Sequence, residues 1–133
     1  MGHRRAGREC ALQMLYGRDI GGISDNEVLQ AWMAMDDILP PVREFAEQLF
    51  KGVTERVDEL DRLIQNQAQN WRLGRMAAVD RNVLRLAAFE LLYGGNNPAS
   101  AIINEAIELA RKFSTQDSAQ FVNGILDSIR KGK

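Results

Sequence analysis

The chain has 133 residues, 45% of them hydrophobic and 26% charged, which fits one globular domain. One cysteine and one histidine exclude an internal disulfide, the Cys/His zinc sites and any catalysis that needs two imidazoles. No apolar run of roughly 18 residues occurs, so we expect neither a membrane span nor a signal peptide. We therefore expect residues 1–133 to form a single soluble domain in the cytoplasm.

Charge is divided unevenly along the chain, although the net charge is only −1. Residues 1–18 carry four arginines and one glutamate, residues 19–70 have a net charge of −7, and residues 71–133 have a net charge of +3. Two basic ends thus flank an acidic middle. Local basic surfaces are typical of nucleic-acid binding, but ordinary solvated helix faces explain the same counts equally well.

Apolar residues recur at intervals of three and four along the chain, which predicts an all-α fold of six or seven helices. The first helix is expected over about residues 5–17, and Gly21-Gly22 breaks its pattern. The four residues 24–27 form a capping box that opens the second helix. We expect Trp32 and Met35 on the buried side of that helix.

A third helix is expected to start at Pro40-Pro41 and its apolar stripe continues to Ile64, with a division at Gly52 or near Asp58. Residues 71–95 are the most apolar segment, and we interpret them as the central helix because apolar side chains surround it.

Two further helices complete the predicted fold. One contains residues 102–110, and Ser114-Thr115 caps the last, which carries residues 121–129. The sequence has no internal repeat and no interdomain linker.

The sharpest functional feature is the group of arginines near the start. At about 100° per residue, Arg4, Arg5 and Arg8 fall within about 100° of arc, with Tyr16 near the same edge. Arginine forks pair with phosphate oxygens and a tyrosine stacks on unpaired bases, so the pattern indicates binding of single-stranded nucleic acid. Solvated charge with a tyrosine that seals the core edge stays open as the alternative.

A second group surrounds the start of the last predicted helix. Asp117 has two interpretations, an acceptor for a base amino group or a carboxylate that satisfies free helix amides. Phe113 and Phe121 fit either a core or a nucleic-acid track, and Gln120 lies beside them.

Patterns for catalysis and metal binding are weak. Glu105 and Glu108 share a helix face, but helical di-metal sites need histidine partners and His3 is the only histidine. No Gly-rich phosphate loop follows a strand, and no set of serine, histidine and acid can be assembled. We therefore expect a protein that is not an enzyme and holds no metal or cofactor.

Four strings occur in one order: RRAGRECALQMLYG, VDRNVLRLAAFELL, INEAIELARKFS and FVNGILD. Together they resemble the NusB family over essentially the whole chain. The resemblance implies two packed small helical bundles and a bacterial transcription antitermination factor. Such a factor binds the boxA element of nascent RNA, typically as a heterodimer with the ribosomal protein NusE, and acts on RNA polymerase with other Nus factors.

The resemblance implies RNA contacts by Arg4, Arg5, Arg8, Asp117 and Phe121. With Phe113 and Gln120 from the same tail segment, these residues form the expected RNA-binding set. The resemblance also implies that Tyr16 and Asp80 lie near the NusE contact, and that some members form homodimers which cover the RNA-binding face. Ala6-Gly7 interrupts the arginines and lowers helix propensity, so we expect modest affinity for RNA alone.

Two other functions remain open on the sequence. One is a helical adaptor whose basic patches bind acidic proteins. The other is a detached accessory module of an RNA cytosine methyltransferase, because the N-terminal part of some of those enzymes resembles the NusB family.

Overall fold

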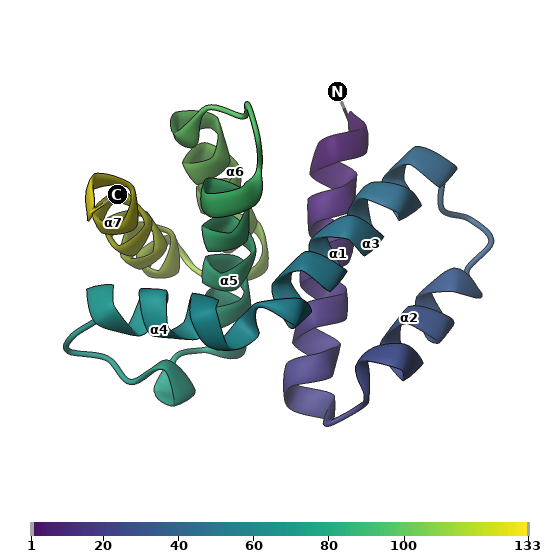
Figure 1. Cartoon of the computed structure of the whole chain (residues 1–133), viewed down its shortest axis with the longest axis horizontal. Helices are drawn as coiled ribbons and strands as arrows, with labels where there is room; N and C mark the ends of the chain where they lie inside the picture. Colours follow the sequence, from purple (N-terminus) through teal and green to yellow (C-terminus); the bar gives the residue numbers. More distant parts are fainter. Residues whose placement is uncertain (1, 133) are drawn as a thin grey trace.

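The computed structural model describes residues 2–132, which form seven α-helices and one short 3-10 turn (Figure 1). The elements are α1 (Gly2–Gly21), α2 (Asp25–Met33), α3 (Pro40–Glu55), α4 (Val57–Gln67), η1 (Leu73–Arg75), α5 (Ala78–Tyr93), α6 (Ala99–Phe113) and α7 (Gln116–Gly132). Helices α1 to α3 form one half and α4 to α7 the other, and α5 contacts both α1 and α3. The predicted all-α fold of two small bundles is confirmed.

Local sequence signals determine several helix ends. The hydroxyl of Ser24 accepts the amide of Glu27 at 3.2 Å, and the Glu27 carboxylate accepts the Ser24 amide at 3.2 Å, which confirms the predicted capping box. Helix α3 begins at Pro40, where a missing amide proton costs no helical hydrogen bond. At the start of α7, the hydroxyl of Thr115 accepts the amide of Ser118 at 3.0 Å.

The first two helices differ from the predicted boundaries. Helix α1 continues through Gly17 to Gly21, and Gly22 then leaves the helix with a φ of 64°, which glycine adopts without strain. Helix α2 ends at Met33, so the expectation that Met35 lies on its buried side is wrong. Met35 is 45% exposed because the chain has already turned toward α3.

Gly52 has a packing role and does not end a helix. The break between α3 and α4 lies at Arg56, in the region of Asp58 that the sequence also offered. Gly52 lies inside α3, where a Cβ atom would come within 2.1 Å of the Phe89 ring on α5. The absence of a side chain therefore lets α3 and α5 approach closely.

Helix α5 is shorter than predicted, because it begins at Ala78 and not at Trp71. The connection before it is fixed by the side-chain amide of Gln65 on α4. Gln65 donates to the carbonyl of Trp71 at 2.7 Å and accepts the amide of Leu73 at 2.8 Å. These bonds satisfy backbone groups that a continuous helix would have paired.

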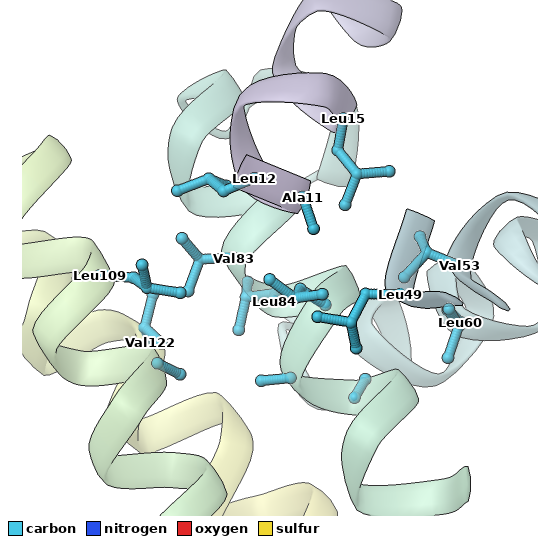
Figure 2. Packing of buried hydrophobic residues seen from close by; sticks show 14 of the residues in the cluster. Ala11, Leu12, Leu15, Leu49, Val53, Leu60, Val83, Leu84, Leu109 and Val122 are labelled. Carbon is cyan, nitrogen blue, oxygen red and sulfur yellow. The ribbon is translucent and has the colours of Figure 1, made fainter. Parts of the chain in front are cut away.

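Helix α5 is the centre of the core, as predicted. It contacts α1, α3, α4, α6 and α7, and its residues 82–88 are all buried. Figure 2 shows apolar side chains from these five helices around Val83 and Leu84 of α5.

A polar network fixes the carboxyl end of α1 on α5. The carboxylate of Asp19 accepts hydrogen bonds from Arg81, Asn82 and Arg85 at 2.8, 2.9 and 3.1 Å. Arg85 also donates two hydrogen bonds to Asp61 of α4, at 2.8 and 3.0 Å. Burial alone raises the pKa of Asp19, but these donors outweigh burial and hold that pKa below its usual value.

Replacing Gly52 by alanine is expected to lower the free energy of unfolding by about 1–3 kcal/mol, because the added methyl overlaps the Phe89 ring. Gly124→Ala in α7 is the matched control. Its Cβ meets open space, so it is expected to stabilise the protein by about 0.5–1 kcal/mol. Urea denaturation followed by circular dichroism measures both. A Gly52→Ala variant as stable as the unchanged protein would contradict this close approach of α3 and α5.

Candidate nucleic-acid interface

The first two arginines of α1 are exposed. The guanidinium carbon of Arg4 lies 4.4 Å from the centre of the Phe45 ring on α3. Arg5 donates two hydrogen bonds to Glu105 of α6, at 3.1 Å from Nε to Oε1 and 2.8 Å from Nη2 to Oε2. Arginine binds phosphate with the same fork. Glu105 therefore engages Arg5 in the way that two phosphate oxygens would.

Arg8 does not share this exposed face. It is 8% exposed, and its Nε and Nη2 donate to the carboxylate of Glu90 on α5 at 2.9 and 2.8 Å. Burial alone lowers the pKa of Arg8, but Glu90 outweighs burial and raises it. Although Arg4, Arg5 and Arg8 lie within one arc of the helix, only Arg4 and Arg5 are exposed. The Arg8 side chain lies one turn before the buried Ala11 and Leu12, on the side of α1 that faces α5.

A second exposed ion pair joins α1 to α6. The ammonium of Lys112 donates to Glu9 at 2.9 Å and lies 5.4 Å from the ring centre of Phe113, the last residue of α6. Together with the Arg5–Glu105 pair, it lines the contact between the two helices with two cations and two carboxylates. We call these four residues the α1–α6 seam. This pairing could not be predicted from the sequence, because 100 and 103 residues separate the partners.

Tyr16 lies on the same side of α1 as the seam. Tyr16 follows Glu9 by seven residues and Arg5 by eleven. At about 100° per residue, both separations bring Tyr16 to nearly the same angle around the helix axis as these two residues. Tyr16 is 38% exposed and lies about 16 Å along the helix from Arg5. A predicted partner contact and a predicted RNA contact therefore occupy one side of α1.

The remaining predicted RNA contacts lie at the start of α7, directly after α6. Asp117 and Gln120 are exposed, and Phe121 is half-buried. The hydroxyl of Thr115 caps the amide of Ser118, and Asp117 lies in the first turn of α7, where its negative charge interacts favourably with the helix dipole.

A pocket of about 310 Å³ lies between η1 and the starts of α5 and α7. Asp80, which was expected near the partner contact, lines it together with Asp117 and Phe121. Trp71 and Arg75 line it as well, and the sequence did not point to either. The one sequence feature that could have indicated them is a tryptophan close to arginines, and it lies in a segment that we interpreted as helix. The structure thus joins two sets of predicted residues in one pocket.

Asp80 is held in this pocket by the start of α7. It is 7% exposed, and its Oδ2 accepts the hydroxyl of Ser118 at 3.0 Å. Its Oδ1 is buried and has no hydrogen-bond partner within the described residues.

The part of the chain that the structure describes contains neither a group of side chains that could bind a metal ion nor a helix that could span a membrane. Residues 2–132 contain no group of three or more His, Cys, Asp or Glu side chains arranged to bind a metal ion. The carboxylates of Glu105 and Glu108 form ion pairs with Arg5 and Arg111. None of the described helices is long and apolar enough to cross a membrane.

These elements supply the groups that a single nucleic-acid strand requires. The exposed fork of Arg5 and the ammonium of Lys112 along the α1–α6 seam suit phosphates, and their contribution weakens as salt concentration rises. Aromatic rings and carboxylates near the start of α7 suit the faces and N–H groups of unpaired bases.

Comparison with known proteins gives one consistent family. The model of the NusB family matches residues 5–131. The transcription antitermination protein NusB of Geobacter sulfurreducens is 47% identical over 132 residues, which cover 97% of this chain and 94% of that protein.

Two solved structures are also similar. NusB of T. maritima has a TM-score of 0.86 at 35% identity, covering 96% of this chain and 90% of that one. A crystal structure of the antitermination factors NusB and NusE in complex with dsRNA contains a chain with a TM-score of 0.84 at 25% identity, covering 100% of this chain and 99% of that one.

Burial distinguishes the ion pairs of Arg5 and Arg8 on α1, and this difference is measurable. Arg8→Ala is expected to lower the free energy of unfolding by about 3–5 kcal/mol, because it leaves the Glu90 carboxylate buried without its partner. Arg5→Ala removes an equally forked but exposed pair, so the urea midpoint should stay nearly unchanged. Urea denaturation of both variants makes the comparison, and equal losses would show that burial does not distinguish these pairs.

Proposed function

The chain belongs to the NusB family, and we propose that it binds the boxA element of nascent RNA as a heterodimer with NusE. As a member of this family it is a non-enzymatic antitermination factor. The observation that carries RNA binding is the exposed fork of Arg5, which is occupied only by a carboxylate that a phosphate can replace. The proposed place of action is the cytoplasm, on RNA polymerase with other Nus factors.

RNA binding proceeds by exchange of partners along the α1–α6 seam. Phosphates displace Glu105 from Arg5 and Glu9 from Lys112, while the Arg4 guanidinium adds positive charge beside Phe45. Such contacts supply affinity without reading sequence.

Base recognition belongs to the start of α7. Asp117 and Gln120 offer polar groups to base edges, and Phe113 and Phe121 offer ring surface. Within the predicted set, Arg8 acts indirectly, because its guanidinium is committed to Glu90 and fixes the orientation of α1.

The proposed NusE contact lies next to the RNA track. Tyr16 and Asp80 are its expected residues, and Tyr16 continues the side of α1 that carries the seam. A related NusB has been crystallised with both NusE and RNA, which supports a joint complex. Self-association through this face would compete with RNA, so the mass of the free protein is part of the test below.

The other two functions have less support. The match covers 94% of the length of NusB from Geobacter sulfurreducens, which favours an antitermination factor over an accessory module of a methyltransferase. An adaptor that binds only acidic proteins would need no pocket with aromatic walls in addition to the α1–α6 seam.

A three-component titration tests the proposal. The protein, NusE and a boxA oligoribonucleotide are mixed with each component omitted in turn, and light scattering and fluorescence anisotropy report mass and affinity. We expect weak, salt-dependent binding by the protein alone and tighter binding with NusE, with a scrambled oligoribonucleotide as control. On single strands, each phosphate contact contributes about −0.7 to the slope of log K against log salt. If the protein with NusE does not bind boxA RNA at low salt, the proposal fails.

Glu105 is expected to compete with RNA for Arg5. Glu105→Gln removes the competing charge at nearly constant shape, so RNA affinity should rise by up to about fivefold. Glu47→Gln on α3, which removes a carboxylate paired with Lys51, is the matched control and should leave affinity unchanged. Anisotropy titrations at low salt compare the three proteins. Weaker binding by Glu105→Gln would show that Glu105 positions Arg5 for RNA and does not compete with it.

A further inference from the structure

Trp71 presents an aromatic ring at the surface through a fixed backbone. The residue is 57% exposed, although tryptophan is a large apolar side chain that proteins usually cover. Its amide donates to the carbonyl of Ala68 at 3.0 Å, and its own carbonyl accepts the Gln65 side chain at 2.7 Å. The ring centre lies 5.9 Å from that of Phe121, with the planes at 76°. Two aromatic walls therefore meet at a steep angle in the pocket.

The same pocket contains one buried hydrogen-bond acceptor that has no donor among the described residues. The Oδ1 atom of Asp80 is buried and unpartnered within the described residues, and such an atom normally has a partner. Asp117 lines the pocket from α7. An occupant that donates N–H groups would satisfy these oxygens.

Size and charge narrow the class of occupant. The volume of about 310 Å³ is at the lower end of the range of about 300–1,000 Å³ for small-ligand pockets, so the pocket accepts one compact planar group. One guanidinium (Arg75) and two carboxylates (Asp80 and Asp117) line the pocket, so it offers acceptors to N–H groups and one donor to a phosphate or carbonyl oxygen. Lys112 of the α1–α6 seam is five residues before Asp117 in the sequence. A group that can bind phosphate therefore lies shortly before the α7 side of the pocket along the chain.

We infer that the pocket between Trp71, Asp80 and Phe121 holds one unpaired nucleobase of the bound RNA. The base stacks on Trp71, and an N–H group on its edge donates to a carboxylate of the pocket. Its phosphates stay outside, toward Arg75 and the α1–α6 seam. This inference rests on the proposed function and names a base-binding position within it.

The test removes the ring and the base separately. Trp71→Ala and Trp71→Phe are titrated, in the presence of NusE, with a boxA oligoribonucleotide and with a series in which one nucleotide at a time is abasic. Leu39→Ala is the control, because it shortens an equally exposed apolar side chain at the start of α3. Affinity for NusE without RNA is measured for every variant, and thermal melts confirm that each one folds.

Trp71→Ala is expected to weaken RNA binding by about fivefold or more, with most of the affinity restored in Trp71→Phe. At one position of the series, the abasic nucleotide should weaken binding to the unchanged protein but not to Trp71→Ala, and such non-additivity identifies the stacked base. NusE affinity should not change in any variant.

Two outcomes overturn the inference alone. In one, the unchanged protein binds RNA but Trp71→Ala binds it equally well. In the other, Trp71→Ala loses affinity for NusE and not for RNA, which would assign the pocket to a protein side chain. If the unchanged protein with NusE does not bind RNA at all, the proposed function fails and this inference fails with it.

Discussion

One buried and one partly buried ion pair hold helix α1 against helix α5, and the position of the exposed surface depends on them. Arg8 pairs with Glu90 near one end of the contact, and Asp19 pairs with Arg81 near the other. The order of these partners makes the two helices antiparallel. Because each contact joins defined atoms, the two pairs fix both the position of α1 along its axis and its rotation about that axis. The side of α1 that carries Arg5 then faces α6.

The same residue type has opposite roles one turn apart on α1. The Arg8 pair is desolvated, so removing either partner leaves a charge without water or counterion. The Arg5 pair is exposed and its partners can separate at little cost. The hydrogen bond from Arg5 lowers the pKa of Glu105 below its usual value, so this carboxyl keeps its charge at neutral pH and into more acidic solution. Glu105 therefore remains an anionic competitor at neutral pH.

Features that depend on neighbouring residues were predictable from the sequence, and features that depend on distant residues were not. Ser24 and Glu27 form the capping box that their spacing predicts, and Pro40 starts α3. The apolar circumference of α5 likewise indicated its central position.

Gly52 and Gly7 are examples of what the sequence could not give. Gly52 was one of the two positions at which a helix break was expected, but its role depends on Phe89 of another helix. Gly7 was interpreted as a loss of helix propensity, yet a Cβ there would lie 2.6 Å from Phe45. The spacing of four residues between Arg8 and the buried Leu12 indicates that Arg8 lies on the buried side of the helix. That spacing does not indicate that Glu90 is its ion-pair partner.

The paired seam sets a requirement on any polyanion that binds it. Glu105 and Glu9 are attached to the same folded chain as the cations, so they compete at a high effective concentration. A single phosphate gains little by replacing one of them, since one charge contact is exchanged for another. A strand gains more when it replaces both carboxylates and also fills a pocket with a base, because linked contacts reinforce one another. The seam therefore favours a ligand that combines regularly spaced phosphates with an unstacked base over one that offers charge alone.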